Sequence, residues 1–176
     1  MTAYDQIWPV AEDHYGIITS PKAKELGVSK QNMVAMEKNG RLERIAHGVY
    51  QVRHHVPTPN DVYAACVAIA GENAYLRGAS VLYMLGLTPA NSSAVYVGTP
   101  NRVRRRLPKG LRIKNNAPCQ GTEYDGYEGI PCQRLVDAFH TAIKDGTVEA
   151  DRIAEAAIKA NEKGLMSDEE CAQFQG

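Results

Sequence analysis

The sequence lacks several features that mark common protein classes. No window approaches the roughly 18 consecutive apolar residues of a membrane span. The start, MTAYDQIWPVAEDHYG, is acidic and lacks the basic-then-apolar layout of a signal peptide. The four cysteines are widely spaced, without a C-x-x-C pair or zinc-ligand spacing. We therefore expect a cytoplasmic protein with reduced thiols, no structural zinc and no membrane partner.

Motifs for catalysis and cofactor binding are also scarce. Neither a G-x-x-x-x-G-K-S/T phosphate loop nor a G-x-G-x-x-G dinucleotide fingerprint occurs, so no cofactor is expected. Cys132 and His140 are eight residues apart on a predicted helix, but no third group that would orient the histidine is evident. Asp125 and Glu128 are close in the chain, yet metal-dependent cleavage needs more clustered carboxylates. We expect neither an enzyme nor a metal site.

The charge is balanced overall but unevenly placed. Residues 19–55 carry seven bases against three acids, and residues 100–116 carry seven bases and no acid. Two basic segments on a chain of zero net charge predict a positive face for a polyanion. We call the second segment the second basic surface: Arg102, Arg104, Arg105, Arg106, Lys109, Arg112 and Lys114.

The first 55 residues carry the signals of a winged helix-turn-helix, three helices followed by a hairpin. Thr19, Ser20 and Ser29 are candidate N-caps, and the short turn before the third helix contains Gly27. We expect residues 1–55 to be a DNA-binding domain. Its elements would be helices near residues 3–15, 21–26 and 30–39 and strands at 42–45 and 49–52.

The sequence pattern of residues 56–176 predicts a mixed α/β domain with a small sheet and several helices. Together with the N-terminal domain, this predicts an α+β fold class for the whole chain. Ile143 and Ile158 are expected on the buried sides of their helices, and Ser167 with Glu170 predicts a capping box for the last helix. The expected elements are helices starting at 58 and spanning 79–85, 135–143 and 148–161, a strand at 94–98 and one or two strands within 103–113.

The third helix has two different sides. At about 100° per residue, Met33 and Met36 share one side. A major groove offers acceptors for Lys and Arg, an adenine edge for Gln and the thymine methyl for small apolar side chains. The side opposite the methionines fits that chemistry. It collects Gln31, Val34, Ala35 and Lys38, with Lys30 and Arg41 at its flanks.

Residues on both sides of this helix are suited to phosphate contacts. Arg44 and His47 lie at the predicted wing, close to the DNA backbone or the adjacent minor groove. Thr19 and Ser20 start the second helix, where hydroxyl and backbone N–H groups can bind phosphate, and Lys22 and Lys24 follow within it.

Several of these stretches resemble one family. The N-terminal points of likeness are a G-I-x-T entry, a helix ending in L-G-V-S and the run G-R-L-E-R-I-x-x-G-V-Y. The later stretches LRGASVLYMLGL, VYVGTP and GIPCQRLVDAFHTAI resemble the same family's C-terminal region. The family is the AbiEi-type antitoxins of type IV toxin–antitoxin systems, and the likeness covers most of the chain.

The resemblance implies a DNA-binding repressor of its own operon, with an operator expected to contain inverted repeats and a nucleotidyltransferase-like toxin as functional partner. It also implies that the family's basic C-terminal surface falls on Arg102, Arg104, Arg105, Arg106 and nearby bases. By matching positions, the DNA-reading residues are Ser29, Lys30, Gln31, Asn32, Ala35 and Lys38, with Arg44 and His47 on the wing.

Other interpretations stay open at this point. The chain can be a ligand-responsive winged-helix transcription factor without a toxin partner, with an effector pocket in residues 56–176. It can also be a protein-interaction module, since winged helices are sometimes used that way. The outer face of the third helix can be an ordinary solvated face, and the second basic surface an ordinary exposed hairpin.

Overall fold

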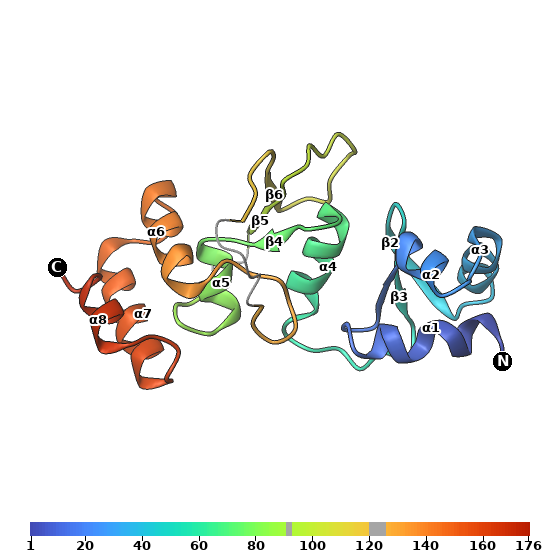
Figure 1. Ribbon diagram of the computed structural model, residues 1–176, viewed down its shortest axis with the longest axis horizontal. Helices are drawn as coiled ribbons and strands as arrows, with labels where there is room; N and C mark the ends of the chain where they lie inside the picture. Colours follow the sequence, from blue (N-terminus) through green and yellow to red (C-terminus); the bar gives the residue numbers. More distant parts are fainter. Residues whose placement is uncertain (91–92, 120–125) are drawn as a thin grey trace. The chain divides into compact units, whose positions relative to one another are not determined.

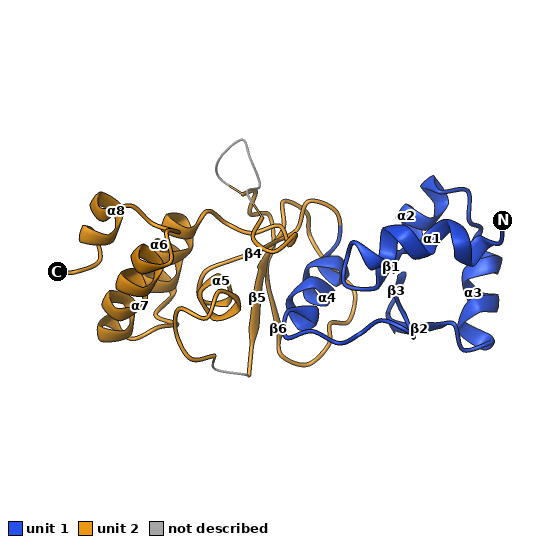
Figure 2. Cartoon of the chain, turned by 90° about the horizontal axis from the view of Figure 1, so that it is seen from below, with its two compact units in different colours: residues 1–71 blue, residues 72–176 orange. Residues whose placement is uncertain are grey.

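The computed structural model describes residues 1–90, 93–119 and 126–176, and it divides the chain into two compact units (Figure 2). Unit 1 comprises Met1–Gly71 and unit 2 comprises Glu72–Gly176. Within these described ranges there are eight helices and two three-stranded sheets, which confirms the α+β class. The domain boundary expected after residue 55 falls inside unit 1 and stays a prediction.

Unit 1 has the element order of a winged helix-turn-helix (Figure 1). Its sheet has the order β1-β3-β2, with antiparallel pairing throughout. Strand β1, which pairs Ile17 with Gln51, was missed in the sequence. The elements are α1 (Ala3–Glu12), β1 (Ile17–Thr19), α2 (Ser20–Glu25), α3 (Lys30–Lys38), β2 (Leu42–Ala46), β3 (Val49–Val52) and α4 (Asp61–Ala70).

Side-chain caps and a glycine turn set the boundaries of α2 and α3. The Thr19 hydroxyl accepts from the Lys22 amide at 3.3 Å, and the Ser29 hydroxyl accepts from the Asn32 amide at 3.1 Å. Each bond satisfies a donor that a helix start leaves unpaired. Gly27 closes α2 with φ +80°, a left-handed conformation that costs glycine little. These local signals confirm the predicted helix-turn-helix.

One apolar cluster joins helices α1, α2 and α3 to the sheet of unit 1. Met33 and Met36 of α3 are 1% and 6% exposed, and Leu42 at the start of β2 is fully buried. The methionine side of α3 is therefore its inner side, as the sequence predicted. The buried members of the cluster are Ile7, Ala11, Ile18, Ala23, Val28, Met33, Met36, Leu42, Tyr50 and Val52.

Unit 2 is built on a second small sheet of order β4-β5-β6, in which β4 pairs antiparallel and β6 parallel to β5. Where the sequence predicted one or two strands within residues 103–113, the structure has one, Leu111–Lys114. Strand β4 was not predicted from the sequence. The elements are β4 (Tyr75–Leu76), α5 (Ala79–Met84), β5 (Val95–Gly98), β6 (Leu111–Lys114), α6 (Leu135–Asp145), α7 (Ala150–Glu162) and α8 (Asp168–Ala172).

Two expectations about the helices of unit 2 are wrong. Ile143 and Ile158 are 49% and 45% exposed, so neither lies on a buried side. Alanines line the inner sides instead, together with Leu135 and Phe139 on α6 and Ile153 on α7. Alanines such as Ala142 leave little space between packed helices, and the two isoleucines fall outside that contact. The capping box of Ser167 and Glu170 is confirmed at the start of α8. No helix among the described residues is both long and apolar enough to span a membrane.

A short clamp precedes α4. His55 Nε2 lies 3.0 Å from Asp61 Oδ2, and the Thr58 hydroxyl donates to Asp61 Oδ1 at 2.6 Å. The His55 ring also packs on Gly16, where a Cβ would meet the His55 Cβ at 2.6 Å. Because Thr58 to Asn60 form this turn, α4 begins at Asp61 and not at Thr58. The clamp thus joins the start of α4 to the backbone that precedes β1.

Replacing Asp61 with Asn should weaken unit 1 and change its acid response. Burial raises the pKa of the Asp61 carboxyl, but the bonds from Thr58 and His55 together outweigh burial and lower it. A carboxyl whose pKa is lower in the folded state stabilises that state at pH values above its unfolded pKa of about 3.9. This stabilisation is lost as the pH falls through the folded-state pKa. We expect Asp61→Asn to lower the free energy of unfolding at neutral pH by about 1–3 kcal/mol and to flatten its acid slope.

Denaturant unfolding followed by Trp8 fluorescence measures this effect, because Trp8 is the single tryptophan and lies in unit 1. The exposed Asp13→Asn serves as the matched control. Equal acid slopes for Asp61→Asn and the unchanged protein would contradict the clamp.

Removing a methionine anchor of α3 should cost far more than removing an exposed side chain. Met33→Ala leaves a cavity in the cluster, and we expect a decrease of about 2–5 kcal/mol in the free energy of unfolding. Val56 is 78% exposed, so Val56→Ala should change it by less than about 0.5 kcal/mol. The same Trp8 titration compares the two variants, and equal decreases would show that α3 does not depend on the burial of Met33.

Candidate nucleic-acid interface

The outer side of α3 is open to solvent. Gln31, Ala35 and Lys38 are exposed, and Val34 between them is half-buried. Lys30 and Asn32, in the first turn of α3, are exposed as well. In the described part of the chain neither Lys30 nor Lys38 pairs with an acidic side chain. The helix therefore presents amide, methyl and ammonium groups on one accessible flank.

Two of the hydroxyls predicted to contact DNA already cap helices. Thr19 Oγ1 and Ser29 Oγ each accept one backbone N–H, as described above. A hydroxyl that accepts in this way still has its O–H to donate. Both caps can therefore donate to a phosphate oxygen without giving up the helix start.

The wing tip is bonded to itself and to the start of α2. A β-bulge between Arg44 and Ala46 interrupts the pairing with β3. Arg44 Nε donates to the Ala46 carbonyl at 3.4 Å, and Arg44 Nη2 lies 3.2 Å from His47 Nδ1. The Ser20 amide donates to the Gly48 carbonyl at 2.9 Å. The structure thus brings Ser20 beside the wing that carries Arg44 and His47.

Two of the predicted cations are engaged by neighbours. Lys22 Nζ lies 3.1 Å from Glu25 Oε2, an exposed pair on α2. The Arg41 guanidinium lies over the Tyr4 ring, 5.1 Å from its centroid. Hydrogen bonds from Thr2 hold the pKa of Asp5 below its usual value, and Arg41 adds a small contribution in the same direction. Arg41 is therefore close to α1, with part of its charge offset there.

Arg53 is an additional base that the sequence did not indicate as a contact residue. The Arg53 amide donates to the Arg41 carbonyl at 3.1 Å, which extends the hairpin by one pair beyond Leu42 and Val52. Arg53 is exposed, so two arginines lie together at the base of the hairpin. Continuing the strand register of the predicted hairpin would have found it.

The second basic surface lies in unit 2, in the connection between β5 and β6 and on β6 itself. All seven of its bases are exposed. The connection is anchored at its base, because the Val103 amide donates to Asn115 Oδ1 at 2.7 Å and the Asn116 amide to the Asn101 carbonyl at 3.1 Å. Arg112 and Lys114 alternate with Leu111 and Ile113, so both cations project from one face of β6.

Cys132 and His140 have separate partners in the structure. Cys132 precedes α6, so the prediction that it shares a helix with His140 is wrong. The Cys132 thiol donates to the Ile130 carbonyl at 3.0 Å, and burial raises its pKa to about 12, which keeps it protonated at neutral pH. The exposed His140 packs instead on Phe174, 5.1 Å between ring centroids. Asp125 lies outside the described residues, within which no cluster of three metal-binding side chains occurs.

Among the solved structures that resemble the chain is one that aligns over nearly the whole length of the chain. The crystal structure of the RV2827C protein from Mycobacterium tuberculosis aligns with 99% of this chain and 81% of its own, at 12% identity and a TM-score of 0.39. At this TM-score the likeness carries no argument about fold or function. No curated protein matches the chain.

The comparison with protein families identifies the N-terminal segment. A family described as "Transcriptional regulator, AbiEi antitoxin" matches residues 5–53, from the first turn of α1 to just past β3. This range contains α3, the wing and both helix caps described above. The resemblance to AbiEi-type antitoxins is therefore confirmed for this segment: residues 5–53 carry the sequence pattern of the AbiEi antitoxin family of transcriptional regulators.

Proposed function

We propose that the chain binds double-stranded DNA through α3 and the wing of unit 1. The observation that carries the proposal is the exposed, acid-poor flank of α3, which lies within the segment matched by a family of transcriptional regulators. A major groove admits one helix, and only the side opposite Met33 and Met36 is available to enter it.

Each exposed side chain of α3 has a distinct chemical use in this proposal. Gln31 can pair in bidentate fashion with an adenine, and the Ala35 methyl can contact a thymine methyl. Lys30 and Lys38 supply charge for guanine acceptors or phosphates. Asn32, beside them in the first turn, adds an amide that can donate and accept. Base reading falls to Gln31 and Ala35, and affinity to the two lysines.

The surrounding groups would fix the position of the helix. The caps Thr19 and Ser29 can donate to phosphates on either side of the groove. The Ser20 amide is hydrogen-bonded to the Gly48 carbonyl of the wing, so α2 and the wing would contact the DNA backbone together. Contacts of this kind set register and orientation without reading sequence. Lys22 and Arg41 would contribute less, because Glu25 and the α1 surface already engage them.

We further propose that the regulator is the antitoxin of a type IV system and represses its own operon. The family description supports the antitoxin assignment for residues 5–53. The functional partner would be a nucleotidyltransferase-like toxin, which need not form a tight complex with the chain. A neighbouring gene with nucleotidyltransferase motifs would support this assignment, and its absence would favour a regulator without a toxin. The chain would act in the cytoplasm, where its operator lies.

The second basic surface would contribute sequence-independent contacts. The segment that holds its seven bases, residues 100–116, contains no acid. The connection between β5 and β6 is anchored at its base, so these exposed cations are suited to bind phosphates. We propose no catalytic role for either unit. The protonated Cys132 thiol and the packing of His140 on Phe174 support that view.

The direct test of the proposal is binding to the DNA upstream of the chain's own gene. The double variant Gln31→Ala with Lys38→Ala removes one base-reading group and one charge. We expect at least about a tenfold rise in Kd, because each bidentate base contact is worth about 1–3 kcal/mol. We also expect preference for this DNA over a scrambled sequence to fall. Fluorescence anisotropy at fixed salt measures both.

The matched control is Lys159→Ala with Gln173→Ala, which removes the same two side-chain types from exposed positions in unit 2. It should leave affinity and preference unchanged. An unchanged Kd and sequence preference in the α3 variant would contradict the proposal that α3 enters the major groove, regardless of the result for the control.

The second basic surface should affect all DNA sequences alike. Arg104→Ala with Arg106→Ala should weaken binding to operator and scrambled DNA by the same factor. The slope of log K against log salt should become less steep by about 0.9 for each phosphate that the variant no longer neutralises. A salt series for both DNA molecules measures this. A change in sequence preference, or an unchanged slope, would contradict a phosphate-binding role.

A further inference from the structure

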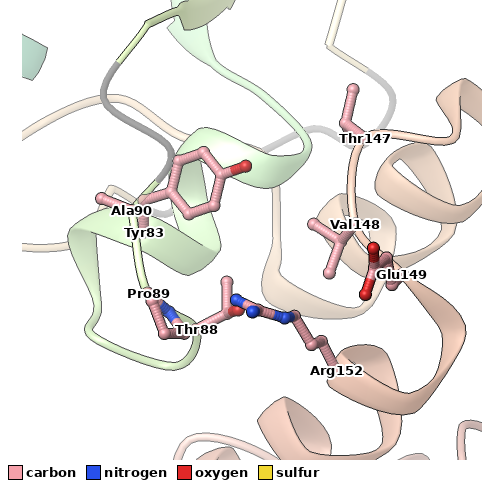
Figure 3. A pocket seen from close by; sticks show the side chains of 8 residues that line it. All are labelled: Tyr83, Thr88, Pro89, Ala90, Thr147, Val148, Glu149 and Arg152. Carbon is pink, nitrogen blue, oxygen red and sulfur yellow. The ribbon is translucent and has the colours of Figure 1, made fainter.

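Unit 2 contains a cavity that the proposed DNA contacts do not use. It lies between the segment that follows α5 and the turn that leads into α7 (Figure 3). Its volume is about 330 Å³, within the usual range of small-molecule sites, about 300–1,000 Å³. The residues that line it are Tyr83, Thr88, Pro89, Ala90, Thr147, Val148, Glu149 and Arg152.

Two opposite charges enter this cavity from the start of α7. Glu149 is the N-cap residue of α7 and Arg152 lies three residues later, so both face the same side of the helix. Although this spacing allows an ion pair, none forms between them or with any other described residue. In Figure 3 the Arg152 side chain extends toward Thr88, while the Glu149 carboxylate lies beside Val148. The two charges are therefore presented separately to the same space.

Hydroxyl groups add to the polar side of the cavity. Thr88 is only 6% exposed, and its hydroxyl has no hydrogen-bond partner among the described residues. The Tyr83 hydroxyl points into the same space in Figure 3. Burial and the neighbouring Tyr96 raise the pKa of Tyr83, while Arg152 acts to lower it, so the guanidinium is close enough to influence the phenol. No buried side-chain oxygen or nitrogen among the described residues lacks a hydrogen-bond partner, so the Thr88 hydroxyl is accessible to solvent and available to a ligand.

We propose that this cavity binds a small zwitterion of the free α-amino acid class, with its carboxylate on Arg152 and its ammonium on Glu149. Arg binds a carboxylate through two parallel hydrogen bonds. Glu149 repels a simple anion and Arg152 a simple cation, whereas a zwitterion satisfies both charges. The hydroxyls of Thr88 and Tyr83 supply further contacts to the carboxylate.

The other wall of the cavity selects among zwitterions. Pro89, Ala90 and Val148 present apolar surface to the side chain of the ligand. An aliphatic side chain there would be removed from water, which adds affinity in proportion to the apolar area buried. The site is thus expected to prefer amino acids with apolar side chains to those with charged ones.

Binding would also connect two segments that already meet elsewhere. Lys163, at the end of α7, donates to the Leu85 carbonyl at 3.1 Å. A ligand between Arg152 and Thr88 would form a second bridge, from the start of α7 to the same segment after α5. Because it binds the folded chain alone, the ligand would raise the thermal stability of unit 2.

The test is calorimetric titration of the full chain with each common L-α-amino acid in turn, without DNA. We expect at least one with an apolar side chain to bind with a Kd of about 1 mM or lower. The amine lacking its carboxylate and the acid lacking its amino group should each bind at least about tenfold more weakly. Arg152→Met and Glu149→Gln should each raise the Kd by a similar factor.

Lys159→Met and Glu162→Gln are the matched controls, because both residues are exposed on α7 and neither lines the cavity. Circular dichroism shows whether each variant is folded. Binding by none of the amino acids would overturn the proposal. So would equal binding of the deaminated acid, which would indicate a simple anion site, or full binding by both cavity variants. Since no DNA is present, failure here leaves the proposed DNA binding unaffected.

Discussion

The burial of Met33 and Met36 is the contact on which the arrangement of unit 1 depends. The two side chains attach α3 to a cluster that also contains Ile7 of α1 and Leu42 of β2. A helix anchored along one side can present only the opposite side, and its rotation about its own axis is thereby set. The choice of methionine suits this role, because its flexible thioether fills irregular space between three helices and a sheet. Packing thus determines which side chains of α3 reach solvent.

Much of unit 1 could be predicted from the sequence, because its signals are local. Ser29 caps the helix whose amides it satisfies, Gly27 adopts a conformation that few other residues tolerate, and Gly48 allows the tight turn of the hairpin. The two-sided pattern of α3 repeats over enough turns to separate its inner and outer sides. Each of these features is decided within a few residues, so no knowledge of the distant chain was needed.

Features that depend on distant residues could not be predicted in this way. The three residues of β1 form a strand because they pair with β3, and the two residues of β4 form one because they pair with β5. The Arg41 guanidinium lies over the ring of Tyr4, a residue far from it in the sequence. The isoleucines of α6 and α7 were placed inward by hydropathy, yet alanine dominates those contacts. In each case the deciding partner lies far away in the sequence.

The place of β6 in its sheet has a consequence for how two copies of the chain can approach. In the described part of the chain β6 is an outer strand, and an outer strand can pair with that of another molecule. Arg112 and Lys114 oppose this, because like charges on two such strands repel. A polyanion that neutralises these cations would remove the repulsion. If the chain binds DNA as proposed, copies on one DNA molecule would lack this repulsion along the β6 edge, whereas copies in solution would keep it.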